Sequence, residues 1–154
     1  MENNLNNRDI DPQETREWID SIQSILETTE IIIVPIVNPD GYEFTYAPGG
    51  DRFWRKNRRN NSGSCEGVDL NRNYSYMWAY DNEGSSNDGC NETYRGNSPF
   101  SEPETQAVRD FVNNHDFKIN FNYHSYGDLL IYPFGYEYDN QALQEDIDIF
   151  IEYG

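Results

Sequence analysis

Between Asn38 and Phe100 the sequence shows neither the alternation that is typical of a strand nor the spacing of an amphipathic helix. The stretch is instead rich in Gly, Asn, Ser and aromatic residues. A long irregular segment inside a compact domain is usually either functional or disordered. Because aromatic side chains occur throughout this one, we expect it to be packed and to carry function.

Regular elements are predicted on the N-terminal side of this stretch. Asp11 followed by Pro12 is a good helix start, and apolar residues then recur at helical spacing (Trp18, Ile22, Ile25 and Leu26). The β-branched run at 30–37 is typical of a strand that is buried on both faces. The chemistry of Asn38-Pro39-Asp40-Gly41 predicts a turn.

On the C-terminal side, Ser101-Glu102-Pro103-Glu104 has the pattern of a capping box that opens a helix to about His115. Apolar residues alternate over 117–123, and 129–132 continues as a second predicted strand. An acidic helix is predicted over 140–153. This succession of helices and strands favours an α/β layer architecture.

Charge and hydropathy exclude two classes of protein. Asp and Glu number 28 against 11 Lys and Arg, so the formal net charge of −17 repels nucleic acid and anionic membranes. No apolar run approaches the roughly 18 residues that a membrane span needs. We predict a disordered polar lead at 1–10, without the basic and apolar regions of a signal peptide, and a single domain over 11–154.

Five of the eleven basic residues are concentrated within eight positions (Arg52, Arg55, Lys56, Arg58 and Arg59). A guanidinium group offers paired donors that match a carboxylate or a phosphate. Arg55, together with Arg72 on a glycine-containing loop, is therefore a candidate anion-binding residue. The alternatives are a solvated charge run and a nucleic-acid patch, and the net charge argues against the patch.

Histidine and cysteine residues give weaker signals. His124 follows a predicted strand, where α/β folds place their sites, and is either a zinc ligand or a structural histidine. Cys65 and Cys90 are too far apart in the sequence for a usual zinc-ligand pair, so they form either a disulfide or two buried thiols. Three glycosylation sequons are compatible with secretion (Asn60, Asn73 and Asn91).

Six short motifs follow one another along the chain. They are Asn38-Pro39-Asp40-Gly41-Tyr42, Phe53-Trp54-Arg55-Lys56-Asn57-Arg58, the run from Cys65 to Asn73, the run from Cys90 to Gly96, Ser101-Glu102-Pro103-Glu104 and His124-Ser125-Tyr126. Their order resembles that of zinc metallocarboxypeptidases of the pancreatic carboxypeptidase A and B type, over roughly residues 28–136. The fold that this resemblance implies is α/β, with a mixed, mostly parallel central sheet flanked by helices.

The resemblance also implies a site. His124 matches the downstream Zn²⁺ ligand, and Arg55 matches the arginine that stabilises the oxyanion of the reaction. Asn71 and Arg72 match the pair that binds the terminal carboxylate of the substrate. Asp69 matches the aspartate that orients an upstream zinc histidine, and Tyr126 matches a subsite tyrosine.

Further expectations concern the setting of the protein. Cys65 and Cys90 match the family's disulfide, which implies an extracellular, secretory or lysosomal compartment. The implied partners are peptide or protein C-termini, without nucleic acid or membrane, and we expect a monomer. The reaction would release C-terminal amino acids.

Two departures from the family pattern limit these expectations. No His-x-x-Glu motif, the source of the other two zinc ligands, occurs in the sequence, and the expected downstream general-base glutamate is also absent. We therefore expect a catalytic domain that is truncated at both ends and inactive as it stands. The alternative is a non-catalytic module that binds peptide C-termini through Asn71 and Arg72.

Overall fold

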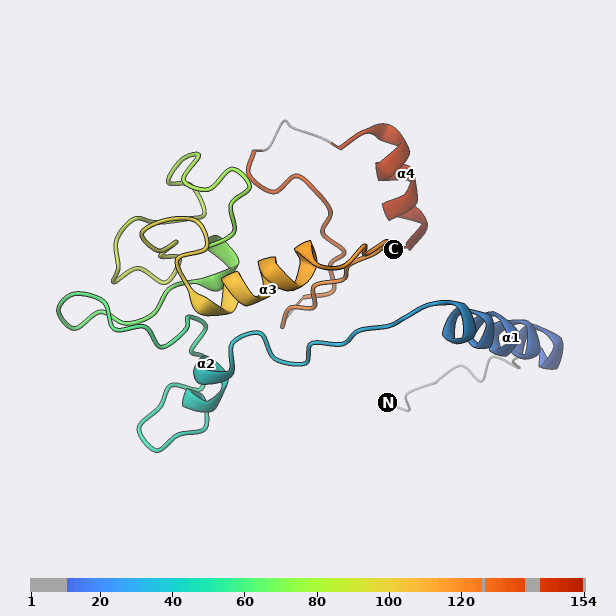
Figure 1. The fold of residues 1–154 in the computed structure, drawn as a ribbon, viewed down its shortest axis with the longest axis horizontal. Helices are drawn as coiled ribbons and strands as arrows, with labels where there is room; N and C mark the ends of the chain where they lie inside the picture. Colours follow the sequence, from blue (N-terminus) through green and yellow to red (C-terminus); the bar gives the residue numbers. More distant parts are fainter. Residues whose placement is uncertain (1–10, 126, 138–141, 154) are drawn as a thin grey trace, which may run out of the picture. The chain divides into compact units, whose positions relative to one another are not determined.

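The computed structural model describes residues 11–125, 127–137 and 142–153 (Figure 1). The chain divides into two units, Met1–Pro35 and Ile36–Gly154. The predicted disordered lead at 1–10 lies outside the described residues. Within the described part of the chain, none of the helices combines the length and the apolar character that crossing a bilayer requires.

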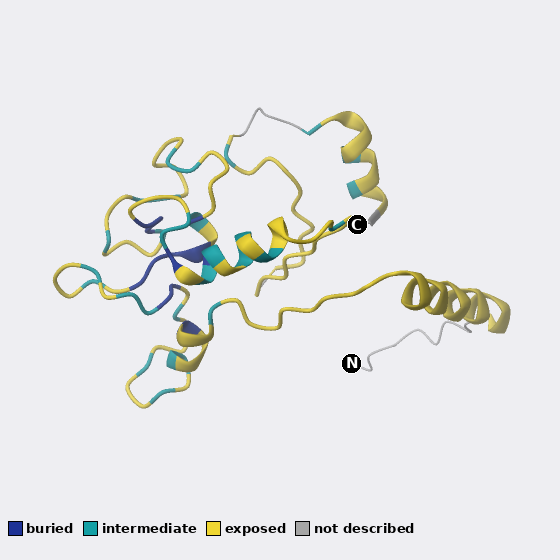
Figure 2. Ribbon diagram, viewed as in Figure 1, coloured by how far each residue is buried: buried dark blue, intermediate teal, exposed yellow. Residues whose placement is uncertain are grey.

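The first unit contains helix α1, Pro12–Thr28. The Asp11 side chain caps the helix by accepting a hydrogen bond from the Gln13 N–H at 2.9 Å, and Pro12 occupies the first turn, as predicted. The predicted apolar stripe is present but exposed, since Trp18 is 68% and Leu26 is 63% exposed. Figure 2 accordingly shows α1 as exposed along its length.

The predicted strands at 30–37, 117–123 and 129–132 do not form in the structure. In the described ranges, pairing is confined to two isolated bridges, Asn60–Glu66 and Ser86–Tyr94. A strand requires a neighbour to satisfy its N–H and C=O groups, and the three predicted segments do not form a ladder with one another. The parallel sheet is therefore not confirmed.

The predicted turn at Asn38–Gly41 is instead the start of helix α2, Pro39–Phe44. Asn38 Oδ1 accepts from the Gly41 N–H at 3.0 Å, and Asn38 Nδ2 donates to the Lys56 carbonyl at 3.0 Å. A Cβ atom at position 41 would overlap both the Asn38 amide and Lys56 O. Asn and Pro at the first positions suit a helix start as well as a turn, and the bond to Lys56 anchors this one.

Helix α3 spans Pro103–Asn113, close to the predicted range, but its cap differs from the prediction. The N-cap is Glu102 rather than Ser101, and its side chain makes no capping bond. Asn73 from the irregular stretch takes that place, because its Oδ1 accepts from the Glu102 N–H at 3.3 Å and from Thr105 Oγ1 at 2.7 Å. A distant residue thus binds the N–H of the N-cap residue, a contact that the predicted capping box did not include.

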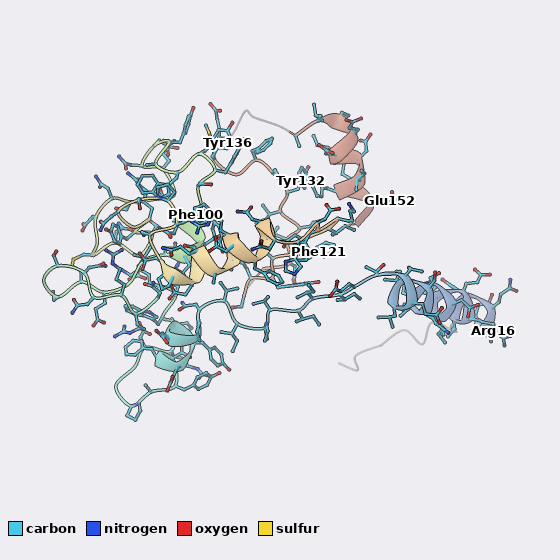
Figure 3. All side chains as sticks on the ribbon, viewed as in Figure 1. Arg16, Phe100, Phe121, Tyr132, Tyr136 and Glu152 are labelled. Atoms are coloured by element: carbon cyan, nitrogen blue, oxygen red, sulfur yellow. A yellow bond between two sulfur atoms is a disulfide. The ribbon has the colours of Figure 1, made fainter. Side chains whose placement is uncertain are left out.

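The last helix, α4, spans Gln144–Tyr153 and confirms the predicted C-terminal helix. Phe150 on this helix stacks on Tyr132, with ring centroids 5.1 Å apart and planes 7° from parallel (Figure 3). The segment at 129–132, predicted as a strand, therefore contacts α4 through an aromatic pair.

The buried interior belongs to the irregular stretch and the start of α3. The buried hydrophobic residues of the described chain are Val68, Leu70 and Tyr94. Buried polar and charged residues outnumber them (Lys56, Asn57, Asp69, Asn73, Arg95, Glu102 and Thr105), and the buried segments are dark in Figure 2. A polar interior requires hydrogen-bond partners throughout, and it therefore fixes the loops in one arrangement.

Candidate functional site

The short 3₁₀ helix η1, Leu70–Arg72, carries two of the predicted site residues. Asp69 caps it, because its Oδ1 accepts from the Asn71 N–H at 3.2 Å and its carbonyl accepts from the Arg72 N–H at 2.9 Å. Gly67 lies just before, with φ at +78°, and turns the chain into this segment. Asp69 thus fixes the backbone from which Asn71 and Arg72 project.

Arg55 joins this group from an earlier segment. Its Nη2 lies 2.7 Å from Asp69 Oδ2, in an ion pair whose Asp69 side chain is 3% exposed and whose Arg55 side chain is 45% exposed. Burial raises the pKa of Asp69 above its usual value, while the positive charges of Arg55 and Arg72 and the Asn71 N–H oppose that shift. The Arg55 guanidinium and the Asn71 N–H therefore meet at one buried carboxyl group.

Arg72 is held by backbone carbonyl groups. Its Nε donates to Gly84 O at 2.5 Å and its Nη1 donates to Asn71 O at 3.1 Å. These bonds orient the guanidinium without neutralising it, since a carbonyl carries only a partial charge. The Asn71 residue is exposed. The site can therefore present a positive charge and an amide to an anion from solvent.

Three other residues of the basic cluster make contacts within the fold, so a wholly solvated charge run is wrong. Lys56 is 2% exposed, and Arg59 Nη1 binds Glu102 Oε1 at 2.6 Å. Arg58 pairs with Glu66 at 2.6 Å and lies 3.6 Å from the ring centroid of Phe44. The sequence did not show these contacts, because each is made with a segment outside the cluster.

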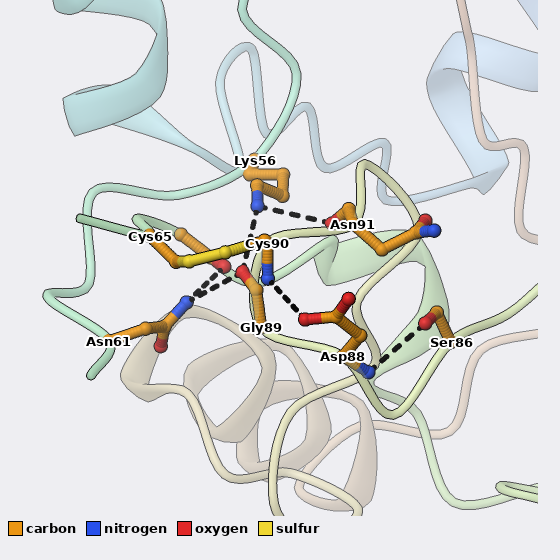
Figure 4. Close-up of a disulfide and its surroundings, with 9 residues drawn as sticks. Lys56, Asn61, Cys65, Ser86, Asp88, Gly89, Cys90 and Asn91 are labelled. Carbon is orange, nitrogen blue, oxygen red and sulfur yellow. Dashed lines mark hydrogen bonds between the residues drawn. A yellow bond between two sulfur atoms is a disulfide. The ribbon is translucent and has the colours of Figure 1, made fainter. Parts of the chain in front are cut away.

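Cys65 and Cys90 form the predicted disulfide (Figure 4). Two side chains hold the same region by carbonyl contacts. Lys56 Nζ donates to Asn91 O at 3.1 Å and to Gly89 O at 3.4 Å, and Asn61 Nδ2 donates to Gly67 O at 2.8 Å. The loop that ends at Cys90 is therefore fixed by polar contacts as well as by the covalent bond.

The three sequons differ in exposure. Asn73 is fully buried, and its Nδ2 donates to Arg95 O, Ser98 O and Ser101 Oγ at 2.8, 3.1 and 2.9 Å. Asn60 and Asn91 are exposed. In the folded chain the Asn73 amide is therefore a structural group and not an acceptor for a glycan.

The residues expected around zinc are not brought together. His124 is exposed in an irregular segment, and Tyr126 lies outside the described residues. The described part of the chain contains no group of three or more His, Cys, Asp or Glu side chains that could hold a metal ion. These residues do not fit a zinc site, which needs at least three protein ligands, and Asp69 contacts Arg55 where a zinc histidine was expected.

Comparison with known proteins identifies the family. The zinc carboxypeptidase family model matches residues 17–151. The metallocarboxypeptidase A-like protein of Trichophyton verrucosum is 43% identical over 128 residues, which cover 80% of this chain and 29% of the relative. Carboxypeptidase A4 of Mus musculus is 42% identical over 130 residues, which cover 83% of this chain and 30% of the relative.

A solved structure agrees with these matches. The crystal structure of thrombin activatable fibrinolysis inhibitor aligns with a TM-score of 0.54 at 42% identity, over 60% of this chain and 22% of that chain. The chain thus spans about 30% of the length of the curated relatives it matches. It belongs to the zinc carboxypeptidase family.

Proposed function

We propose that this chain is part of a metallocarboxypeptidase that releases C-terminal amino acids from peptides, and that it supplies the residues which bind the substrate's carboxylate. One observation carries the proposal. Arg55, Asn71 and Arg72 are all organised by Asp69, through a side-chain ion pair and two backbone hydrogen bonds. Family membership supports the assignment of a peptide substrate.

Each residue has a chemical role in this proposal. Arg72 and Asn71 donate to the terminal carboxylate of the peptide, because a guanidinium and an amide together match its two oxygen atoms. Arg55 stabilises the oxyanion that develops on the scissile carbonyl. Asp69 occupies Arg55 Nη2, and no other hydrogen bond of Arg55 falls within the described residues, so Nη1 and Nε remain for this purpose.

Zinc would activate the attacking water in such an enzyme. His124 is the one zinc ligand that the sequence offers by resemblance, and it belongs to no group of three or more potential ligands in the described chain. We expect the 154-residue chain to bind peptide C-termini without cleaving them. The disulfide supports an extracellular, secretory or lysosomal compartment.

The second candidate is a module whose function is C-terminal recognition itself. The specific observation in its favour is that Asn71 and Arg72 are organised, while His124 belongs to no group of three or more potential metal ligands in the described chain. The retained Arg55 favours the enzyme instead, because a pure binder has no use for oxyanion stabilisation.

Titration of one peptide in two forms tests the carboxylate site. The 154-residue chain should bind the free-acid peptide at least tenfold more tightly than its C-terminal amide, and Arg72→Ala should abolish this difference. Arg16→Ala on α1 is the matched control, because it removes one exposed arginine outside the site. Equal affinity for acid and amide would reject both candidates. Hydrolysis of a blocked dipeptide with added Zn²⁺ would show that the chain is active.

A further inference from the structure

The carboxylate of Glu102 is buried at the start of α3 and lies outside the site described above. The residue is 1% exposed. Its Oε1 accepts from Arg59 Nη1 and from Ser101 Oγ, each at 2.6 Å, and its Oε2 accepts from Asn57 Nδ2 at 2.8 Å. A buried carboxylate is costly unless it is paired and hydrogen-bonded. Here both oxygen atoms are occupied, and each has a different set of partners.

Asn57 connects this carboxylate to the segment that carries Asp69. Asn57 Oδ1 accepts from the Val68 N–H at 2.8 Å and from the Arg59 N–H at 3.3 Å, while the Asn57 N–H donates to Val68 O at 2.9 Å. The residue is 2% exposed. Its side chain and backbone thus hold Val68 from both the donor and the acceptor side.

The contact of Asn57 with Val68 fixes which residues of the 55–59 segment lie opposite those of the 67–69 segment. Arg55 lies two positions before Asn57, and Asp69 directly follows Val68. The 2.7 Å contact of Arg55 Nη2 with Asp69 Oδ2 is formed between these same segments. A displacement by one residue at Asn57 would carry Asp69 away from Arg55, because consecutive residues in an extended chain are about 3.3 Å apart.

We propose that the buried Asn57–Glu102 hydrogen bond positions Arg55 against Asp69. Asn57 and Glu102 are then positioning residues for the carboxylate site. This second statement rests on the proposed function. Neither Asn57 nor Glu102 touches the anion. They act through the alignment of the 55–59 and 67–69 segments, which α3 anchors through Glu102.

The direction of the hydrogen bonds permits a sharp test. Asn57 must present its oxygen to Val68 and its amide nitrogen to Glu102. Asn57→Asp keeps the acceptor toward Val68 but sets two oxygen atoms against each other at Glu102. Glu102→Gln keeps an acceptor toward Arg59 but sets two amide nitrogens against each other at Asn57. The double variant restores one donor and one acceptor with the polarity reversed and the net charge unchanged.

The starting protein, the two single variants and the double variant should be compared in a Glu104→Ala background. Glu104 Oε2 also accepts from Asn57 Nδ2, at 3.3 Å, and would otherwise replace part of the lost contact. The first readout is the ¹⁵N–¹H spectrum of the Arg55 guanidinium, with Asp69→Asn as the reference for a lost ion pair. Each single variant should move these signals to the Asp69→Asn position, and the double variant should return them. Asn87→Asp, a charge change at an exposed residue, is the control that should leave them unchanged.

The second readout is the ratio of affinities for the free-acid and amide forms of one peptide. We expect at least a tenfold loss of this ratio in each single variant and recovery to within threefold in the double variant. Failure of the starting protein to distinguish acid from amide would reject the proposed function, whereas the Arg55 spectrum would still test the alignment.

Two outcomes would overturn the positioning role. In the first, folded single variants keep the Arg55 signals at their original position, so that Asn57 and Glu102 contribute to stability alone. In the second, the single variants unfold and the double variant either unfolds too or folds with Arg55 at the Asp69→Asn position. Recovery of the fold and of the Arg55 signals together in the double variant would support the proposal.

Discussion

Arg55 Nη2 lies 2.7 Å from Asp69 Oδ2, although the two residues are 14 positions apart in the sequence. The pair is asymmetric, because the carboxylate is almost fully buried whereas the guanidinium is nearly half exposed. Asp69 therefore depends on Arg55 for its charge compensation, while Arg55 can still face a ligand. This asymmetry underlies the first two predictions.

Replacement of Arg55 by Met should lower the free energy of unfolding at neutral pH by about 1 to 3 kcal/mol, because it leaves a buried carboxylate without its charged partner. Asp69→Asn should cost less, since a neutral amide can still accept from the Asn71 N–H. Urea unfolding of both single variants and the double variant measures the coupling. Strict additivity of the two changes would contradict an energetic role for the pair.

The pH dependence of stability should show the raised pKa of Asp69. Because burial raises that pKa above 3.8 in the folded chain, the unfolded chain releases its proton first as the pH rises. The unfolding free energy of the wild type relative to Asp69→Asn should therefore fall as the pH rises through about 4, and should level off above the folded-state pKa. Urea unfolding of both proteins between pH 3 and 8 measures this difference. A difference that rises with pH would show that the ion pair outweighs burial.

Gly67 and Gly63 offer a matched pair of substitutions. Their φ angles are nearly equal, at +78° and +77°, so Ala introduces similar backbone strain, about 1 kcal/mol, at each. A Cβ atom at Gly67 would also overlap Asn57 O and Lys56 Cβ. A Cβ atom at Gly63 would have no neighbouring atom within 4 Å. Gly67→Ala should cost a further 1 to 3 kcal/mol or so in thermal unfolding. Equal costs would contradict the close approach of the two segments.

Removal of the disulfide by Cys65→Ser with Cys90→Ser should cost about 3 kcal/mol, since it frees a loop closed over a sequence separation of 25. The contacts of Lys56 with Gly89 and Asn91 should keep the loop folded in this variant. A further Lys56→Met change should then expose it to limited proteolysis. Reductant should destabilise the wild type and leave the double serine variant unchanged, and equal sensitivity of both would contradict the prediction.

Asn73→Ala should destabilise the chain by more than about 3 kcal/mol, because the buried partners of the Asn73 amide all lose their hydrogen bonds at once. Asn60→Ala is the matched control at an exposed sequon and should stay within about 0.5 kcal/mol of the wild type. Thermal unfolding compares the two. Similar small losses in both variants would mean that the polar interior contributes little to stability.

Sequence patterns were sufficient to locate α1, α3 and α4, whereas the segment of α2 was predicted as a turn. Asp11 and Pro12 define the start of α1 by a cap that needs only the next two residues. The strands were also predicted from sequence patterns, at 30–37, 117–123 and 129–132, but they did not form. A helix satisfies its backbone within one segment, whereas the run at 30–37 requires a partner that the described chain does not provide.

The candidate site divides in the same way. Motif order along the sequence identified the family and singled out Arg55, Asn71 and Arg72, because a motif requires nothing beyond neighbouring residues. No sequence pattern showed that Arg55 would pair with Asp69, or that Asn73 would cap α3. Nor did any pattern show that Lys56, one position from Arg55, would be buried.

By itself, then, the sequence located α1, α3 and α4, identified the family and predicted which residues could bind an anion. Only the tertiary structure decided which charges are buried and which face solvent, and that Asn57, Asn73 and Glu102 organise the interior. The physical reason is that burial and long-range hydrogen bonds depend on which distant segments meet. The chemistry of a side chain does not by itself show whether such a partner will be there.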